Sequence, residues 1–314
     1  MLNVLLTGPT GFIGKALLKH LLEKQEHNAA SFSKISVATR KKLDISCPQY
    51  LIGDLSGSID WAEVLESQDV VIHAAGRAHV LHESSQDSGK EYIRVNTDAT
   101  LNLAQQAADT GVKRFVYLSS IGVNGHVNTS PFSVGDPSSP TSLYAESKWK
   151  AEQGLWSIQK ATGMQVVILR PPLAYGPSAP GNFHRLIQWV ERGIPLPLGA
   201  VYNKRTLVGV DNLVDLIRVC IDHPAAANRV ILAGDDEDVS TTQILRGIAE
   251  GMGRPSRLIP VPESLLWAGA SVLGKKTMAE KVLGSLQVDI SETKRLLDWE
   301  PPYSFAEGMQ RCFE

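Results

Sequence analysis

Short apolar runs rich in β-branched residues alternate with longer stretches of helical periodicity along the first half of the chain. Such runs predict strands, and the stretches between them predict helices. The expected strands are 3–7, 35–39, 70–74, 114–119 and 165–170, and the expected helices are 12–24, 91–109 and 143–161. Val70-Val71-Ile72 is apolar at successive positions, which indicates burial on both faces of a sheet. The pattern predicts an α/β fold, a doubly wound parallel sheet of the Rossmann type.

The pattern changes after Arg170, where six prolines between positions 171 and 197 interrupt any regular periodicity. Farther on, Asp211 is placed to cap a helix over 212–222, and 230–233 predicts a strand that can return to the first sheet. Ser240 and Ser304 begin capping boxes, which predict two late helices. The expected domains are a dinucleotide-binding domain at 1–170, which also takes in about 208–235, and a smaller, mostly helical substrate-binding domain at 171–207 and 236–314.

The most apolar later stretch is 265–273, with the sequence LLWAGASVL. It is about half as long as the ~20 residues that cross a bilayer. We therefore expect it to form a core helix and not a membrane contact.

Composition narrows the class of protein. Hydrophobic residues make up 43% of the chain and charged residues 20%, which is typical of a globular protein. A net charge of −2 gives no field that would gather nucleic acid or an anionic membrane, so an anionic ligand must be held by local groups. Three scattered cysteines and a short apolar start without a basic segment favour a reducing cytoplasm over export.

A glycine-rich turn, Gly8-Pro9-Thr10-Gly11-Phe12-Ile13-Gly14, directly follows the first expected strand and opens the first helix. A dinucleotide's pyrophosphate needs glycines for a tight turn and close backbone approach, and it needs the free N–H groups of a helix start. We expect Gly8, Gly11, Phe12, Ile13 and Gly14 to bind a dinucleotide.

The ends of the next strands predict the rest of the cofactor site. No acid follows Thr39, whereas Arg40 is placed to pair with a 2′-phosphate, which favours NADP and leaves NAD as the alternative. Asp54 and Leu55 follow the third strand, where a carboxylate can accept from the adenine amino group. Ala74, Ala75 and Gly76 end the fourth, where small residues permit close approach of the backbone.

Tyr144 and Lys148 are four residues apart in an expected helix and therefore share one of its faces. A neighbouring ammonium favours the phenolate and so lowers the pKa of a tyrosine from about 10, which would help Tyr144 to exchange protons near neutrality. Ser119 and Ser120 end the fifth strand, where one hydroxyl would reach the reacting oxygen of a substrate.

Together these motifs resemble the extended short-chain dehydrogenases/reductases, and within them the sugar-nucleotide epimerases, dehydratases and 4-ketoreductases. The matching stretches are TGPTGFIG, GDL, HAAG, Val95-Asn96-Thr97, YLSSIGVNG, YAESK, RPPLAYGP and KRTLVGVDNLVD. The resemblance implies that Ser120, Tyr144 and Lys148 are the catalytic residues. It also implies that Tyr144 and Lys148 contact the cofactor and that Asn96 is a polar anchor near the site.

The resemblance further implies a nucleotide-linked sugar as substrate, contacted by the stretch after RPPLAYGP. Ser120, Asn182, Phe183, the 195–199 segment and Arg205 fall where substrate contacts are usual. A planar guanidinium meets two phosphate oxygens at once, so Arg205 is expected at the diphosphate. A UDP-linked sugar and a homodimer are the expected partners.

Two reactions remain open within the family. Dehydratases place an acidic pair after the active-site hydroxyl, where this chain has Ile121-Gly122, so dehydration is not expected. Reduction of a 4-keto sugar by NADPH is favoured over 4-epimerisation, because no acid follows Thr39. A non-catalytic NADP-binding regulator and a reductase of apolar ketones are less expected. The intact catalytic residues disfavour the regulator, and the charge of Arg205 disfavours an apolar substrate.

A metal site is not expected. His79, His82 and Glu83 lie close together, but their spacing fits no familiar zinc pattern. Hydride transfer of this type needs no metal.

Overall fold

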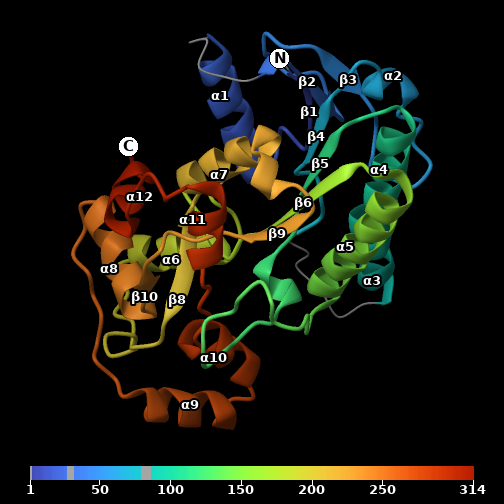
Figure 1. The fold of residues 1–314 in the computed structure, drawn as a ribbon. Helices are drawn as coiled ribbons and strands as arrows, with labels where there is room; N and C mark the ends of the chain where they lie inside the picture. Colours follow the sequence, from blue (N-terminus) through green and yellow to red (C-terminus); the bar gives the residue numbers. More distant parts are fainter. Residues whose placement is uncertain (1, 27–31, 79–85) are drawn as a thin grey trace.

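The computed structural model describes residues 2–26, 32–78 and 86–314 (Figure 1). Seven parallel strands form the large sheet in the order β3-β2-β1-β4-β5-β6-β9. They are β1 Leu2–Thr7, β2 Phe32–Thr39, β3 Gln49–Leu51, β4 Val70–His73, β5 Arg114–Leu118, β6 Gln165–Arg170 and β9 Arg229–Leu232. The doubly wound sheet expected from the sequence is therefore confirmed, and the strand near 230–233 does return to it.

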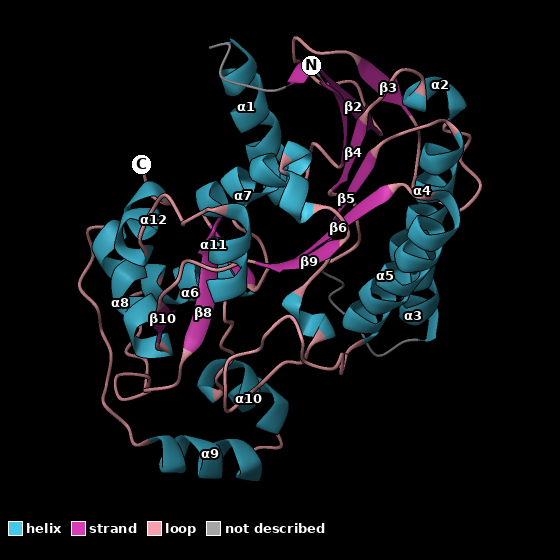
Figure 2. Cartoon of the chain, in the orientation of Figure 1, coloured by secondary structure: helices cyan, strands magenta, loops and turns pink. Residues whose placement is uncertain are grey.

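Helices cover both faces of this sheet, because successive strand residues point to opposite sides (Figure 2). Val4 and Leu6 join one hydrophobic cluster, and Leu5 between them joins the other. The first face carries α1 Phe12–Glu26 and α7 Val210–Asp222; the second carries α2 Ala62–Leu65, α4 Ala99–Asp109 and α5 Leu143–Thr162. The single helix expected at 91–109 is instead α3 Gln86–Tyr92, a π-helical turn Ile93–Asp98 and α4.

A second, three-stranded sheet has the order β10-β8-β7. Its strands are β7 Leu173–Tyr175, β8 Arg205–Gly209 and β10 Asp238–Val239, and the helices that follow or surround it are α6 Asn182–Glu191, α8 Thr241–Gly251, α9 Glu263–Val272, α10 Lys276–Leu283, α11 Ser291–Leu297 and α12 Phe305–Arg311. Ser240 and Ser304 form the expected capping boxes. Asp211 lies in the first turn of α7 and accepts from Arg311, so it does not cap that helix.

The expectation of a core helix at 265–273 is wrong. None of the residues of α9 is buried, and Leu265, Val272 and Leu273 are exposed. The inward residues Leu266 and Trp267 are partly buried against a small cluster, but no further layer of the described chain covers the outer side. A membrane-crossing length is not reached by any helix within residues 2–26, 32–78 and 86–314.

Candidate active site

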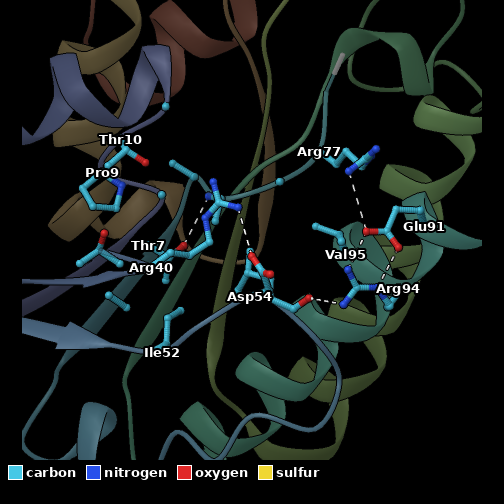
Figure 3. A pocket seen from close by; sticks show the side chains of 18 residues that line it. Thr7, Pro9, Thr10, Arg40, Ile52, Asp54, Arg77, Glu91, Arg94 and Val95 are labelled. Atoms are coloured by element: carbon cyan, nitrogen blue, oxygen red, sulfur yellow. Dashed lines mark hydrogen bonds and ion pairs between the residues drawn. The ribbon is translucent and has the colours of Figure 1, made fainter. Parts of the chain in front are cut away.

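A cavity of about 530 Å³ opens at the carboxyl ends of β1, β2 and β4, beside the start of α1 (Figure 3). In doubly wound sheets, ligands bind where the strand order reverses, here between β1 and β4. Eight residues expected at a dinucleotide line it: Gly8, Gly11, Arg40, Asp54, Leu55, Ala74, Ala75 and Gly76. The sequence did not single out the other lining residues as ligands: Thr7, Pro9, Thr10, Ala38, Thr39, Ile52, Arg77, Glu91, Arg94 and Val95.

The glycine turn leaves no room for side chains at two of its positions. Gly8 has a φ of +73°, and a Cβ there would lie 2.7 Å from the backbone of Ala75. A Cβ at Gly14 would lie 2.0 Å from the Gly8 carbonyl oxygen, so α1 packs directly on the turn. Gly11 lines the cavity itself. This arrangement fits a pyrophosphate held against a helix start.

Phe12 and Ile13 do not line the cavity. Their side chains pack against the hydrophobic core, so any contact with a cofactor is left to their backbone. The cofactor role expected for these two residues stays a prediction.

Charged side chains pair around the cavity (Figure 3). Arg40 Nη1 is 3.1 Å from Asp54 Oδ1, and both side chains are exposed. Arg94 donates to the Leu55 carbonyl oxygen at 2.9 Å and to Glu91 at 2.6 Å. Glu91 also lies 3.8 Å from Arg77 Nη1, and the two arginines hold its pKa below the usual value. The only sequence signal for this group is the helical spacing of Glu91 and Arg94.

The structure brings Ser120 and Tyr144 together. Ser120 caps a short 3₁₀ turn by accepting from the Gly122 N–H at 3.1 Å, and its hydroxyl lies close enough to Tyr144 to lower the pKa of that phenol. Lys148 donates to the Leu118 carbonyl oxygen at 2.8 Å. A Cβ on Gly76 would lie 3.3 Å from Lys148 Nζ, so the lysine reaches the wall of the dinucleotide cavity.

The pKa values of Tyr144 and Lys148 differ from what the sequence predicted. Burial raises the pKa of Tyr144 to about 12, against the opposing effect of its hydrogen bond with Ser120. Burial also lowers the pKa of Lys148 to about 8, while Glu152 opposes this shift. The expected lowering of the Tyr144 pKa by Lys148 is therefore not found, because desolvation of the phenolate dominates. Tyr144 is protonated at neutral pH.

A buried ion pair lies behind this cluster, one helical turn beyond Lys148. Glu152 is fully buried and accepts from Arg170 Nη2 at 2.5 Å and from Ser119 Oγ at 2.5 Å. Arg170 also donates to Asn124 Oδ1 at 2.9 Å. The pair engages the hydroxyl of Ser119, so Ser120 stays the candidate serine of the site. Nothing in the local sequence distinguishes Glu152 or Arg170 from surface charges.

Asn96 is a buried polar anchor, as the resemblance implies. Its Nδ2 donates to the Arg77 carbonyl oxygen and to Ser147 Oγ, both at 3.0 Å. Its Oδ1 accepts from the Arg77 N–H at 2.8 Å. Asn96 thus ties the segment after β4, which lines the cavity, to the helix α5 that carries Tyr144 and Lys148.

His73, at the end of β4, is fully buried between two hydroxyls. Its Nδ1 is 2.7 Å from Thr7 Oγ1, and its Nε2 is 3.0 Å from Thr100 Oγ1. The Thr100 hydroxyl donates to the Asn96 carbonyl oxygen, so Nε2 must carry the proton given to Thr100. Burial lowers the pKa of His73 to about 3, and the ring is neutral in the folded protein.

We expect His73 to make the fold sensitive to acid. The unfolded chain takes up a proton near pH 6.5 and the folded chain does not, so stability falls as the pH drops from about 6.5 toward 3. The slope attributable to this residue is about 1.4 kcal/mol per pH unit. Urea unfolding of wild type and His73→Gln at pH 7 and pH 5 measures it. Equal pH slopes for the two proteins would rule out this role.

The substrate side is only partly accounted for. Arg205 begins β8 and donates to the carbonyl oxygens of Lys281 at 3.2 Å and Gly284 at 3.0 Å, and burial lowers its pKa. Asn182 begins α6 and is exposed, whereas Phe183 is fully buried against Tyr175. The side chain of Phe183 therefore offers no surface to a substrate in this structure. Substrate contacts of Asn182 and Arg205 stay predictions.

The histidine and glutamate cluster at positions 79, 82 and 83 lies outside the described residues. Within the part of the chain that is described, no group of three His, Cys, Asp or Glu side chains is arranged to hold a metal ion.

Comparison with known proteins adds to this geometry. Residues 4–234 match the family model described as "NAD dependent epimerase/dehydratase family". The chain is 41% identical over 312 residues to a UDP-glucose 4-epimerase of Vibrio cholerae, covering 98% of this chain and 94% of the relative.

Solved structures share the fold. A UDP-glucuronic acid 4-epimerase from Bacillus cereus in complex with NAD superposes with a TM-score of 0.79 at 21% identity, covering 99% of this chain and 97% of that one. A UDP-glucose 4-epimerase from Thermotoga maritima with UDP-glucose gives a TM-score of 0.76 at 21% identity, with the same coverage.

Proposed function

Because the chain belongs to the NAD-dependent epimerase/dehydratase family, we propose that it interconverts UDP-sugars that differ at C4, with NAD as its dinucleotide. It is an NAD(P)-dependent enzyme that acts at C4 of a nucleotide-linked sugar. The favoured expectation of net reduction by NADPH gives way to 4-epimerisation, since the 41% identical relative is a 4-epimerase. The preference for NADP is likewise corrected to NAD, which a structural neighbour binds.

The charges at the cavity support this correction. An arginine selects a 2′-phosphate when its guanidinium is free to pair with it. Here Arg40 forms an ion pair with Asp54 at 3.1 Å, and the Asp54 carboxylate adds a negative charge beside the place that the 2′-phosphate would take. An NAD ribose, which is uncharged, meets no such repulsion.

The chain's own residues would handle the proton and the substrate oxygen. A bound dinucleotide would supply the hydride acceptor and donor that inversion at C4 requires. The Ser120 hydroxyl lies close enough to Tyr144 to lower the pKa of that phenol, so the two oxygens would be placed to share the C4 oxygen of a substrate. Tyr144 would first have to release its own proton to solvent; as a phenolate it would then accept the C4 hydroxyl proton and later return it to the C4 oxygen. Lys148, at the cavity wall beside Gly76, would orient the dinucleotide next to Tyr144.

The observation that carries the proposal is the meeting of the Ser120–Tyr144 pair with the glycine-lined cavity through Lys148 and Gly76. Purified protein should convert UDP-glucose to UDP-galactose, or the matching N-acetyl sugars, without a consumed cofactor. NADPH oxidation by a UDP-4-keto sugar, with no inversion of any UDP-sugar, would instead support the reductase.

The Arg40–Asp54 pair should decide between the two dinucleotides. In Asp54→Asn, Arg40 is freed and the repelling charge is gone, so NADPH should bind up to about fivefold better relative to NADH. Arg40→Ala should change the preference little, because the arginine is already engaged. Fluorescence titration with both nucleotides measures the ratio. A large selective loss of NADPH in Arg40→Ala would restore NADP as the natural cofactor.

Arg205 tests the substrate class. If it binds the diphosphate, Arg205→Ala should lose charge-assisted hydrogen bonds worth roughly 1.5–3 kcal/mol, or about 10- to 150-fold in affinity for UDP. Arg205→Lys should recover only part of the loss, because an ammonium cannot bond two oxygens in a planar fork. Calorimetry measures the affinity of each variant for UDP. Circular dichroism checks that the fold survives the loss of the hydrogen bonds from Arg205 to the end of α10. Unchanged UDP binding by the alanine variant would remove Arg205 from the substrate site.

Two further expectations, one about the oligomeric state and one about the cellular compartment, remain predictions. The resemblance implies a homodimer formed through paired helices, which size measurement in solution would test. The expected reducing compartment also stays a prediction.

A further inference from the structure

The helix α9 is apolar on two sides. Leu266, Trp267 and Ala270 face inward and pack against a cluster that includes Leu198 and Leu245. On the outer side Leu265, Ala268, Gly269, Val272 and Leu273 recur at the spacing of a helical stripe, and all of them are exposed. A helix that is apolar all round is usually covered on both sides, in a core or by lipid.

The exposure is greatest where α9 ends. Val272 is 88% and Leu273 70% exposed, and every residue from 271 to 278 is exposed. Gly274, with a φ of +66°, turns the chain into α10 at this point. Figure 1 shows α9 at the edge of the molecule, beyond α10 and away from the large sheet. The outer side of α9 and the following Lys275–Lys276, together called the tip, therefore project from the molecule and are accessible to a flat surface.

The charge of the tip indicates what covers it. Between positions 264 and 279 the charged residues are Lys275 and Lys276, and no acid occurs. Both lysines are exposed directly beside Val272 and Leu273. The net charge of the whole chain is −2, so this basic tip is a local feature. An apolar stripe with flanking lysines matches an anionic bilayer, whose interior takes the stripe and whose headgroups pair with the lysines.

A second copy of the chain fits the tip less well. Stable protein interfaces use about 20–30 residues on each side, whereas the outer stripe offers five. In a two-fold contact the same patch faces itself, so the lysines of both copies would be brought together and repel.

We propose that the tip formed by the outer side of α9 and Lys275–Lys276 docks the protein onto anionic membrane surfaces without crossing the bilayer. Each lysine should contribute about fivefold to binding of an anionic surface, and the attraction should weaken with salt. This inference does not depend on the identity of the sugar substrate.

Co-sedimentation of the full chain with phosphatidylglycerol/phosphatidylcholine vesicles, and with phosphatidylcholine vesicles alone, tests the proposal. Wild type should bind the anionic vesicles much more tightly, and raising the salt to about 0.5 M should weaken that binding. The Lys275→Gln/Lys276→Gln variant should lose about 25-fold, and the Val272→Asn/Leu273→Asn variant at least about tenfold. The replaced side chains are exposed, so melting temperatures should stay near that of wild type.

Matched controls lie on distant elements. Leu51→Asn replaces a leucine that is 64% exposed in β3, and Lys19→Gln/Lys160→Gln removes two exposed lysines from α1 and α5. Neither control should change vesicle binding. No binding by wild type, survival of binding in either tip variant, or equal losses in the controls would overturn the proposal. A smaller assembly for Val272→Asn/Leu273→Asn in sedimentation velocity, without vesicle binding by wild type, would assign the tip to a second copy instead.

Discussion

Tyr144→Phe should lower turnover by about 10²- to 10⁴-fold, the usual contribution of a positioned proton-transfer group. The substitution removes one hydroxyl, which lies beside Ser120, and leaves the partly buried ring in place. Dinucleotide affinity should hardly change, because the glycine turn and the rest of the cavity wall are untouched. Rates of UDP-sugar interconversion and a direct binding titration measure the two effects separately.

Tyr117→Phe is the matched control. Tyr117 is a fully buried tyrosine whose ring lies 4.6 Å from Lys148 Nζ and whose hydroxyl makes a long, 3.4 Å bond to the Asn96 carbonyl oxygen. Its loss should cost turnover far less than the loss of the Tyr144 hydroxyl. Comparable losses in the two variants would mean that buried tyrosines support the fold here and that Tyr144 has no special part in catalysis.

Glu152→Ala should destabilise the protein by about 3–5 kcal/mol, since it leaves the Arg170 guanidinium buried without its counter-ion. The same helix provides a control in Glu146, which pairs with Lys150 at 2.8 Å on the surface. Glu146→Ala should cost less than about 1 kcal/mol. Urea unfolding of the three proteins measures both values. Similar costs for the two variants would contradict the burial of the Glu152–Arg170 pair.

Glu152 should also affect the chemistry through Lys148. Its charge opposes the lowering of the Lys148 pKa, so Glu152→Gln should move that pKa further below about 8. The high-pH limb of the activity profile should then shift to lower pH, because charged Lys148 is lost earlier. A purely structural residue would change the amplitude of the profile and not its position.

Local features of the chain were predictable because they depend on neighbours in sequence. Strand 165–170 was expected at the bounds that β6 has, and 143–161 agrees with α5 to within one residue. The glycine turn belongs to the same class, since the φ of Gly8 and the tight packing of Gly14 follow from their place between β1 and α1. Tyr144 and Lys148 could be paired as candidates from their helical spacing, whereas Ser120 was chosen over Ser119 through the family resemblance.

Partners that come from distant segments were decided only by the tertiary structure. In the sequence Arg40 has no acidic neighbour. In the structure it forms an ion pair with Asp54, which follows the next strand of the sheet. Ser119 and Ser120 end the same strand, and the Glu152 carboxylate that engages Ser119 comes from a helix far along the chain. Glu152 and Arg170 themselves look like surface charges, and only the packing of α5 on β6 buries them.

The helix α9 also shows where prediction from sequence ends and tertiary structure decides. The stretch LLWAGASVL predicts a helix whose apolar side chains avoid water, and this prediction needs only the local sequence. Whether that cover comes from the chain's own core depends on how many layers the fold places around it. The described structure supplies one layer, on the inner face. Hydrophobic periodicity reports which residues avoid water, and only the arrangement of the whole chain decides what they meet instead.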